Sequence, residues 1–149
     1  MEKYYYRYEE FVRDLKELHS MIAAFQPDTL LPVARGGLTM GHFLAEAMGT
    51  RRVYALNSIH YEGTQKLETL DIFNIPDLSD ARKVLILDDI ADSGETLVEV
   101  LRRLRELYPD IHFKIATLFY KSSALIQPDF TVKEAPAWID FFWEIDPRD

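Results

Sequence analysis

The run from Val84 to Leu97 constrains the fold of this chain more than any other segment. It begins with apolar residues, continues with two adjacent carboxylates (Asp88 and Asp89), and passes through small and polar residues into an amphipathic stretch. The apolar run is typical of a buried parallel strand, and the stretch after it is typical of a helix. The two acids are therefore predicted at the carboxyl end of a strand, where open α/β sheets bind their ligands.

The turn between this strand and helix has the chemistry of a phosphate site. It consists of Asp92, Ser93, Gly94, Glu95 and Thr96. Its backbone N–H groups, its two hydroxyls and the helix N-terminus can converge on one point, which holds a phosphate dianion without much positive charge. The neighbouring acids repel a phosphate unless they accept hydrogen bonds from sugar hydroxyls or act through a divalent cation. The predicted ligand is a sugar phosphate, together with magnesium.

The same residues resemble the 5-phosphoribosyl-1-pyrophosphate (PRPP) signature of the type I phosphoribosyltransferases. That signature has four apolar residues, two acids, three variable positions, then Ser or Thr, Gly, any residue and Thr, and every required position is matched. The resemblance implies that Asp88 and Asp89 bind the ribose and Mg²⁺, with Asp89 as the metal ligand, and that residues 92–96 bind the 5-phosphate. The competing interpretation is a plain strand, an acidic surface loop and a capped helix.

Arg35, Gly36 and Gly37 form a second turn between a predicted strand and helix. Glycines allow the backbone to approach a bulky anion, and an arginine presents a planar fork of donors to it. The segment is similar to the pyrophosphate loop of the same family, commonly Ser-Arg-Gly-Gly, with Ala34 in place of the serine. The resemblance therefore assigns these three residues to the pyrophosphate group, although a glycine pair after a strand is also an ordinary turn.

Three features bear on the base that accepts the ribose. In the family branch that acts on 6-oxopurines, the position of Asp92 resembles a catalytic carboxylate near the purine N7, which accepts or stabilises a proton there. Lys121 follows an apolar strand and resembles the lysine that donates to O6 of the base. Trp138 and Ile139 resemble the stacking segment of the bacterial xanthine-guanine enzymes, whereas Trp143 is assigned to packing.

The resemblance thus implies a purine salvage enzyme, a glycosyltransferase that moves the 5-phosphoribosyl group from PRPP to N9 of guanine, xanthine or hypoxanthine. The products are the nucleoside monophosphate and pyrophosphate. A transferase for another base stays open, and so does a regulator that binds PRPP or nucleotides without transferring anything. The preference among the three purines is not predicted, because backbone groups read the 2-position of the base. Most such enzymes form homodimers or homotetramers.

Composition agrees with this interpretation. The chain has 149 residues, 48% of them hydrophobic, which is enough for one α/β domain over residues 1–149. A net charge of −8 disfavours nucleic acid and anionic membrane surfaces as partners, because both require a basic field. There is no cysteine, no apolar N-terminal run and no apolar stretch long enough for a membrane span, so we expect a cytoplasmic location.

Strand and helix patterns alternate, which predicts an α/β fold: a mainly parallel sheet with helices on both faces, here joined by a small C-terminal hood. An irregular loop is expected from His60 to Asp80, where His60 stands at a position that is small and polar in the family. The helix after Arg35 is expected to be capped by the Thr39 hydroxyl. The expected helices are 9–25, 39–48 and 96–108, and the expected strands are 30–34, 53–59, 84–87, 113–120 and 130–133.

Overall fold

The computed structural model describes residues 2–62 and 68–149. In this part of the chain, the main sheet has six strands in the order β4-β3-β2-β5-β6-β7. The strands of this sheet are β2 (Thr29–Ala34), β3 (Leu56–Glu62), β4 (Glu68–Phe73), β5 (Lys83–Ala91), β6 (His112–Tyr120) and β7 (Phe130–Glu134). All neighbouring pairs are parallel except β3 and β4. The predicted α/β class with a mainly parallel sheet is confirmed.

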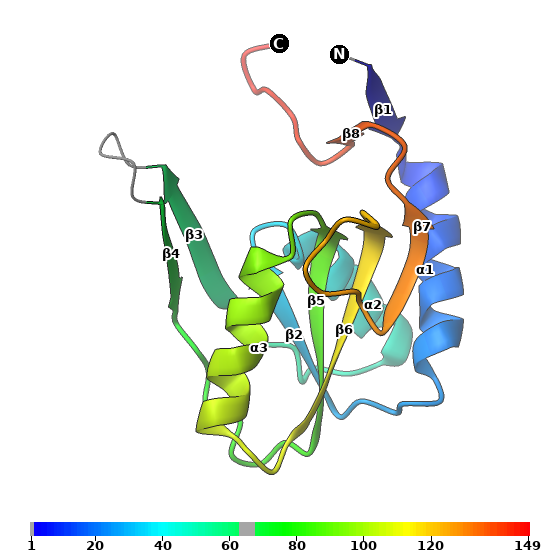
Figure 1. The fold of residues 1–149 in the computed structure, drawn as a ribbon. Helices are drawn as coiled ribbons and strands as arrows, with labels where there is room; N and C mark the ends of the chain where they lie inside the picture. Colours follow the sequence, from blue (N-terminus) through cyan, green and yellow to red (C-terminus); the bar gives the residue numbers. More distant parts are fainter. Residues whose placement is uncertain (1, 63–67) are drawn as a thin grey trace.

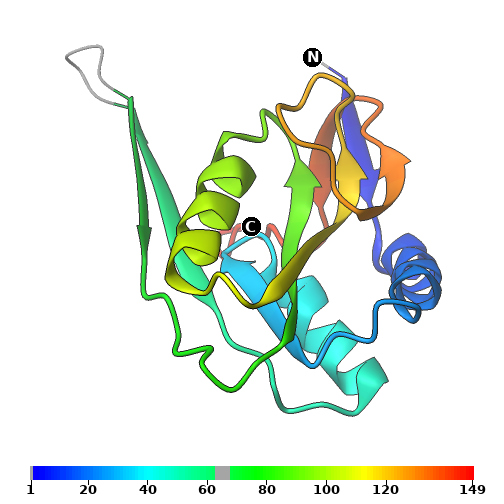
Figure 2. The same cartoon turned by 60° about the horizontal axis from the view of Figure 1, so that its bottom comes forward.

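Helices cover both faces of this sheet (Figures 1 and 2). They are α1 (Tyr8–Ile22), α2 (Leu38–Met48) and α3 (Glu95–Leu107). The apolar stripe of α3 packs against one face of the sheet in one buried cluster, and α1 and α2 share a second buried cluster with the opposite face. Burial of these stripes is the main stabilising term for such helices. No helix within the described ranges is both long and apolar enough to cross a membrane.

A second, two-stranded sheet forms the hood, which joins β1 (Lys3–Tyr6) to β8 (Trp138–Phe141) in parallel. Figure 1 shows this pair above the carboxyl end of the main sheet, close to the start of α1. The hood is confirmed, but the contribution of β1 was not predicted. Tyr6 covers the core with 1% of its surface exposed, whereas Tyr5 remains 61% exposed.

Two local expectations are wrong. Helix α2 begins at Leu38 after Gly37 and has no side-chain cap, so Thr39 lies inside the helix and does not cap it. The expected loop after His60 is instead mostly ordered strand: β3 continues to Glu62, and β4 returns antiparallel to it. The section 63–67 of that expected loop lies outside the described residues. The predicted strand 53–59 is shifted, since Val53 makes only an isolated bridge to Leu30.

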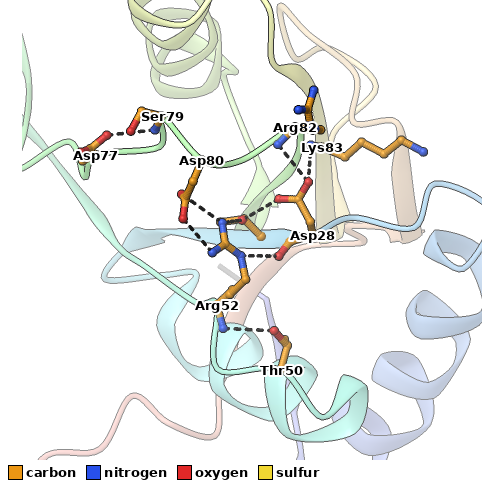
Figure 3. A network of polar contacts seen from close by, with 9 residues as sticks. Asp28, Thr50, Arg52, Asp77, Ser79, Asp80, Arg82 and Lys83 are labelled. Carbon is orange, nitrogen blue, oxygen red and sulfur yellow. Dashed lines mark hydrogen bonds and ion pairs between the residues drawn. The ribbon is translucent and has the colours of Figure 1, made fainter.

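At the amino end of the sheet, a polar network fastens the chain before β3 to the chain after β4 (Figure 3). The Asp28 carboxylate accepts hydrogen bonds from the backbone N–H groups of Arg82 (2.9 Å) and Lys83 (2.8 Å). The Arg52 guanidinium donates to the Asp28 carbonyl oxygen (3.1 Å) and pairs with the Asp80 carboxylate (3.2 Å). We call this network, centred on Asp28 and Arg52, the basal clamp.

Candidate functional site

A cleft of about 970 Å³ lies at the carboxyl edge of β2 and β5. Its walls come from five parts of the chain: the end of β2 and the turn after it, the start of α2, strand β3, the end of β5 with the start of α3, and the segment after β8. This is the edge at which a parallel sheet is expected to bind ligands. Five predicted site residues line this large cleft: Arg35, Gly36, Asp88, Asp89 and Thr96.

Asp88 and Asp89 are half-buried side by side at the end of β5. Removal from water raises the pKa of Asp88, and the charge of Asp89 raises it further. Burial likewise raises the pKa of Asp89. The Asp88 carboxylate accepts a hydrogen bond from the Asp89 N–H (2.9 Å). Among residues 2–62 and 68–149, no cationic side chain is paired with these two desolvated carboxylates, an arrangement suited to hydroxyl donors or a metal ion.

The turn after β2 lies directly against this acidic pair. A Cβ atom on Gly36 would stand 2.7 Å from a carboxylate oxygen of Asp88 and equally close to one of Asp89, so only glycine fits there. Gly37 is buried instead of lining the cleft, and a Cβ on it would meet the Leu87 carbonyl oxygen at 2.3 Å. Gly37 therefore allows the close packing of α2 on β5, while Arg35 is exposed at the cleft.

The predicted phosphate turn surrounds a separate small cavity of about 80 Å³. Asp92, Ser93, Gly94 and Thr96 line it, and Asp88 and Thr96 also line the large cleft. Gly94 has a φ of +86° and begins α3, a conformation that side-chain-bearing residues rarely adopt. Glu95 is exposed, and its backbone N–H donates to the Ser93 hydroxyl oxygen (3.3 Å).

Lys121 and Trp138 line a third cleft of about 470 Å³, between the end of β6 and the hood. Trp138 is 59% exposed, as a stacking residue would be in the absence of its partner. Lys121 forms an ion pair with Asp92 (Nζ to Oδ1, 2.8 Å), which joins this cleft to the phosphate turn. Ile139 is buried with 6% of its surface exposed, so only its backbone can face a ligand.

Sequence reasoning missed several lining residues of the large cleft. From β3 and α2 come Ser58, His60 and Thr39, and from the segment after β8 come Trp143, Glu144, Ile145 and Asp146. Trp143 does pack as predicted, since its ring stacks on Phe141 at 4.6 Å, but its position in the cleft was not anticipated. Burial raises the pKa of Glu144, and the nearby charges of Asp140 and Asp89 raise it further. No short-range signal pointed to the residues after β8, because their position depends on the hood, whereas Thr39 and His60 drew attention in the sequence for other reasons.

The donor set at β5 fits a hard divalent cation in one respect: it offers carboxylate oxygens at a cleft, which Mg²⁺ prefers. Within residues 2–62 and 68–149, no group of three or more acidic or histidine side chains is arranged to hold a metal ion. A cation at Asp88 and Asp89 must therefore complete its shell with water and ligand oxygens, which is how Mg²⁺ is commonly held at phosphate sites.

Comparison with known proteins places this geometry in a family. Residues 5–148 match the phosphoribosyl transferase domain model. The structure is similar to the Helicobacter pylori xanthine-guanine-hypoxanthine phosphoribosyltransferase, with 41% identity, a TM-score of 0.92, and 99% of this chain and 97% of that chain covered. A purine phosphoribosyltransferase from Pyrococcus horikoshii Ot3 has 32% identity, a TM-score of 0.85 and the same coverage. Orotate phosphoribosyltransferase from Aeropyrum pernix shares the fold at 15% identity and a TM-score of 0.60, over 86% of this chain and 73% of that one.

Proposed function

Because this chain belongs to the phosphoribosyltransferase family, we propose that it transfers the 5-phosphoribosyl group from PRPP to N9 of a 6-oxopurine, with residues 1–149 as one catalytic domain. The observation that carries the choice of base is the Lys121–Asp92 ion pair beside Trp138. An ammonium and a carboxylate next to each other match O6 and N7 of a 6-oxopurine, while the indole offers a stacking surface. The named activity of the H. pylori protein supports the same choice, and that of the P. horikoshii protein supports a purine.

In this proposal, each of the three cavities described above binds a different part of PRPP or the base. The turn 92–96 holds the 5-phosphate through backbone N–H groups and the hydroxyls of Ser93 and Thr96. Asp88 and Asp89 accept hydrogen bonds from the ribose hydroxyls, and Arg35 with the backbone at Gly36 and Gly37 binds the pyrophosphate. In this assignment, C1 of the ribose, whose bond to the pyrophosphate oxygen breaks, lies between the large cleft and the cleft at Lys121.

Mg²⁺ is the cofactor that this arrangement calls for, with Asp89 as the protein ligand and Asp88 beside it. When bound, the ion neutralises the pyrophosphate leaving group. Phosphoribosyltransferases generally use Mg²⁺ with PRPP, and the raised pKa values of the two carboxyls reflect a site that lacks compensating charge.

Asp92 is the proposed catalytic residue. As N9 of the purine attacks C1 of the ribose, the purine ring gives up a proton, and a carboxylate near N7 accepts or stabilises that proton. Lys121 donates to O6 and so stabilises the negative charge that the ring acquires. Trp138 stacks on the purine, and the backbone carbonyl at Ile139 faces the 2-position. Carbonyl groups accept from the 2-amino group of guanine, which supports guanine as a substrate.

The test is a pyrophosphate-release assay with PRPP and Mg²⁺ against guanine, xanthine, hypoxanthine, adenine, orotate and uracil. We expect turnover with the 6-oxopurines, and at least 10²-fold less with adenine or the pyrimidines, because an unmatched polar group in such a site is strongly rejected. Faster turnover with orotate or uracil would reassign the base. PRPP binding without turnover of any base would instead support a regulator.

A further inference from the structure

The hood holds the base-stacking strand, yet it is a sheet of its own. Within the described residues, β8 is hydrogen-bonded in a ladder only to β1, with Lys3 opposite Trp138 and Tyr4 opposite Ile139. The position of Trp138 relative to Lys121 therefore depends on the short connection from β7 to β8 and on what holds β1. A group that fixes β1 to the main sheet thus helps to set the width of the base cleft between them.

Two tyrosines of β1 end in a polar cluster shared with α1 and β7. The Tyr6 hydroxyl donates to the Asp14 carboxylate (2.7 Å), and the Tyr4 hydroxyl donates to the Glu10 carboxylate. The Lys133 ammonium contacts both acids, at 2.6 Å from Glu10 and 3.1 Å from Asp14. We call these five residues the hood anchor.

Two anchor residues are buried and the other three are half-buried, so their contacts are less screened by water than those of exposed pairs. Asp14 is buried, and Tyr6 is almost fully buried. Burial would lower the pKa of Lys133, but its hydrogen bonds to Glu10 and Asp14 raise it. Burial would also raise the pKa of Glu10, yet the donors Lys133 and Tyr4 hold it below its usual range. The ammonium and the Glu10 carboxylate are thus held charged against each other.

Lys133 also connects the anchor to the other wall of the base cleft. It lies on β7 opposite Phe119 of β6, and the neighbouring Ala135 N–H donates to the Tyr120 carbonyl oxygen (2.9 Å). The next residue of the chain after Tyr120 is Lys121. Lys133 therefore links the hood, through its ammonium and the two acids, to β6, through the backbone of β7; β6 is the strand that precedes Lys121.

From this connection we propose that Lys133 is a positioning residue for the purine: through Tyr4 and Tyr6 it sets the distance between Trp138 and Lys121. This inference rests on the proposed function. Aromatic packing of Tyr6 on Phe119 (4.8 Å between ring centres) also holds the hood. Apolar contacts tolerate small sideways shifts of one ring on the other, whereas hydrogen bonds depend on direction and therefore fix the position of the hood relative to the main sheet.

The experiment compares Lys133→Met, Lys133→Arg and Tyr6→Phe with the unmodified protein. The methionine variant removes the shared ammonium and leaves Glu10 and Asp14 facing each other, so KM for the base is expected to rise by roughly 10- to 100-fold, as for a small misplacement of a bound reactant. KM for PRPP is expected to stay within about twofold of the unmodified protein, because its proposed groups lie on β2, β5 and α3. Lys133→Arg keeps charge and donors, and is expected to restore most of the base affinity.

Tyr6→Phe keeps every ring contact and both ion pairs and removes only the hydroxyl. It is the deciding variant if Lys133→Met does not fold, and its KM for the base is expected to rise about three- to tenfold, the net contribution of one typical hydrogen bond. Ile72→Val, at a buried position of β4, is the control for lost stability alone and leaves both KM values unchanged.

Amide hydrogen exchange of β8, measured without substrate, separates this inference from the proposed function. Faster exchange at residues 138–141 in Lys133→Met and Tyr6→Phe, with exchange in β5 unchanged, supports the anchor even if no purine is turned over. Unchanged exchange in β8 would overturn it. Equal increases in KM for PRPP and for the base would also overturn it, because they indicate a general loosening of the site.

Discussion

Two groups of aspartates stand at opposite ends of the same strands. In the basal clamp, the Asp28 carboxylate receives N–H groups from the start of β5, and these bonds hold its pKa below the usual range although burial acts in the opposite direction. At the other end of β5, burial raises the pKa of both Asp88 and Asp89. Asp28 and Asp80 of the clamp are paired with N–H donors and a guanidinium of the chain, whereas Asp88 and Asp89 are the acids proposed to bind groups of the ligand.

The acid that stabilises the fold therefore lies at the start of β5, and the two acids proposed to bind the ligand lie near its end. A satisfied carboxylate contributes to folding, and a desolvated pair of like charges opposes it unless a ligand binds. Natural active sites often retain such destabilising arrangements. The comparison predicts that substitutions at the two ends of β5 have opposite consequences.

The largest effect is expected from Asp89→Asn. Loss of the carboxylate should lower kcat/KM for PRPP by about 10²- to 10³-fold, as for other groups that face developing or bound charge. The melting temperature of the variant without ligand should not decrease, because the substitution removes one of two carboxylates that repel each other. Asp88→Asn should also stabilise the free protein, by roughly 1 kcal/mol. A lower melting temperature in both variants would show that the acidic pair stabilises the fold.

The second prediction compares two of the exposed ion pairs, Lys121–Asp92 and Arg52–Asp80. Asp92→Asn is expected to lower kcat by about 10²-fold with KM for PRPP little changed, because a catalytic proton acceptor is lost. Lys121→Met should instead raise KM for the base roughly tenfold, the loss of one charged hydrogen bond. Asp80→Asn is the matched control and should alter neither constant. Steady-state kinetics with PRPP and the base varied in turn, each at saturation of the other, checks all three variants.

At the basal clamp, Asp28→Ala is expected to reduce stability and leave the chemistry unchanged. The substitution strips two backbone N–H groups of their acceptor, which costs about 2 kcal/mol. For a chain of this size, that corresponds to a melting temperature lower by roughly 4–8 °C. The melting temperature from calorimetry and kcat/KM at 25 °C measure the two properties separately. Lost activity in the folded variant would contradict the division between the two ends of β5.

The smallest effect is in the response to acid. Because the pKa of Asp28 is lower in the folded protein than in the unfolded chain, its contribution to stability is complete above about pH 4 and is lost as pH falls through the folded value. Asp88 and Asp89 have raised values, so their unfavourable contribution disappears on acidification. Asp28→Asn should therefore flatten the loss of stability below pH 4, as measured by denaturant unfolding between pH 7 and pH 3. An unchanged slope would assign that loss to other carboxyls.

Local segments were predictable to the extent that their physics is local. The run 84–97 contains its strand, its acids and its helix start within a few residues, and the structure reproduces that order. The roles of Asp92, Lys121 and Trp138 stay predictions, although their positions agree with them. The hairpin was missed because Asn74, Pro76 and Asp77 masked the alternation of Leu70 and Ile72 that marks β4.

The hood could not be read in the same way. Its strands pair Tyr4 with Ile139, and nothing in a short window records a partner so distant in the sequence. The predicted Thr39 cap is wrong because the helix already begins at Leu38, after Gly37, and the threonine lines the cleft. Likewise, Glu144 and Trp143 enter the cleft only because β8 ends where it does. Contacts that decide the base cleft are long-range, and those that decide the phosphate turn are not.

The pairing of β1 with β8 also has a consequence for how the protein is made. A ribosome releases β1 before any other described strand and β8 after all of them, so the phosphate turn can form while the stacking surface for the base is still unsynthesised. Until then, β1 has no partner strand and its tyrosines have only α1 and β7 to hold them. In the proposed assignment, the turn for the 5-phosphate is thus synthesised before the strand that stacks on the base, and residues 143–146, which complete the large cleft, follow that strand.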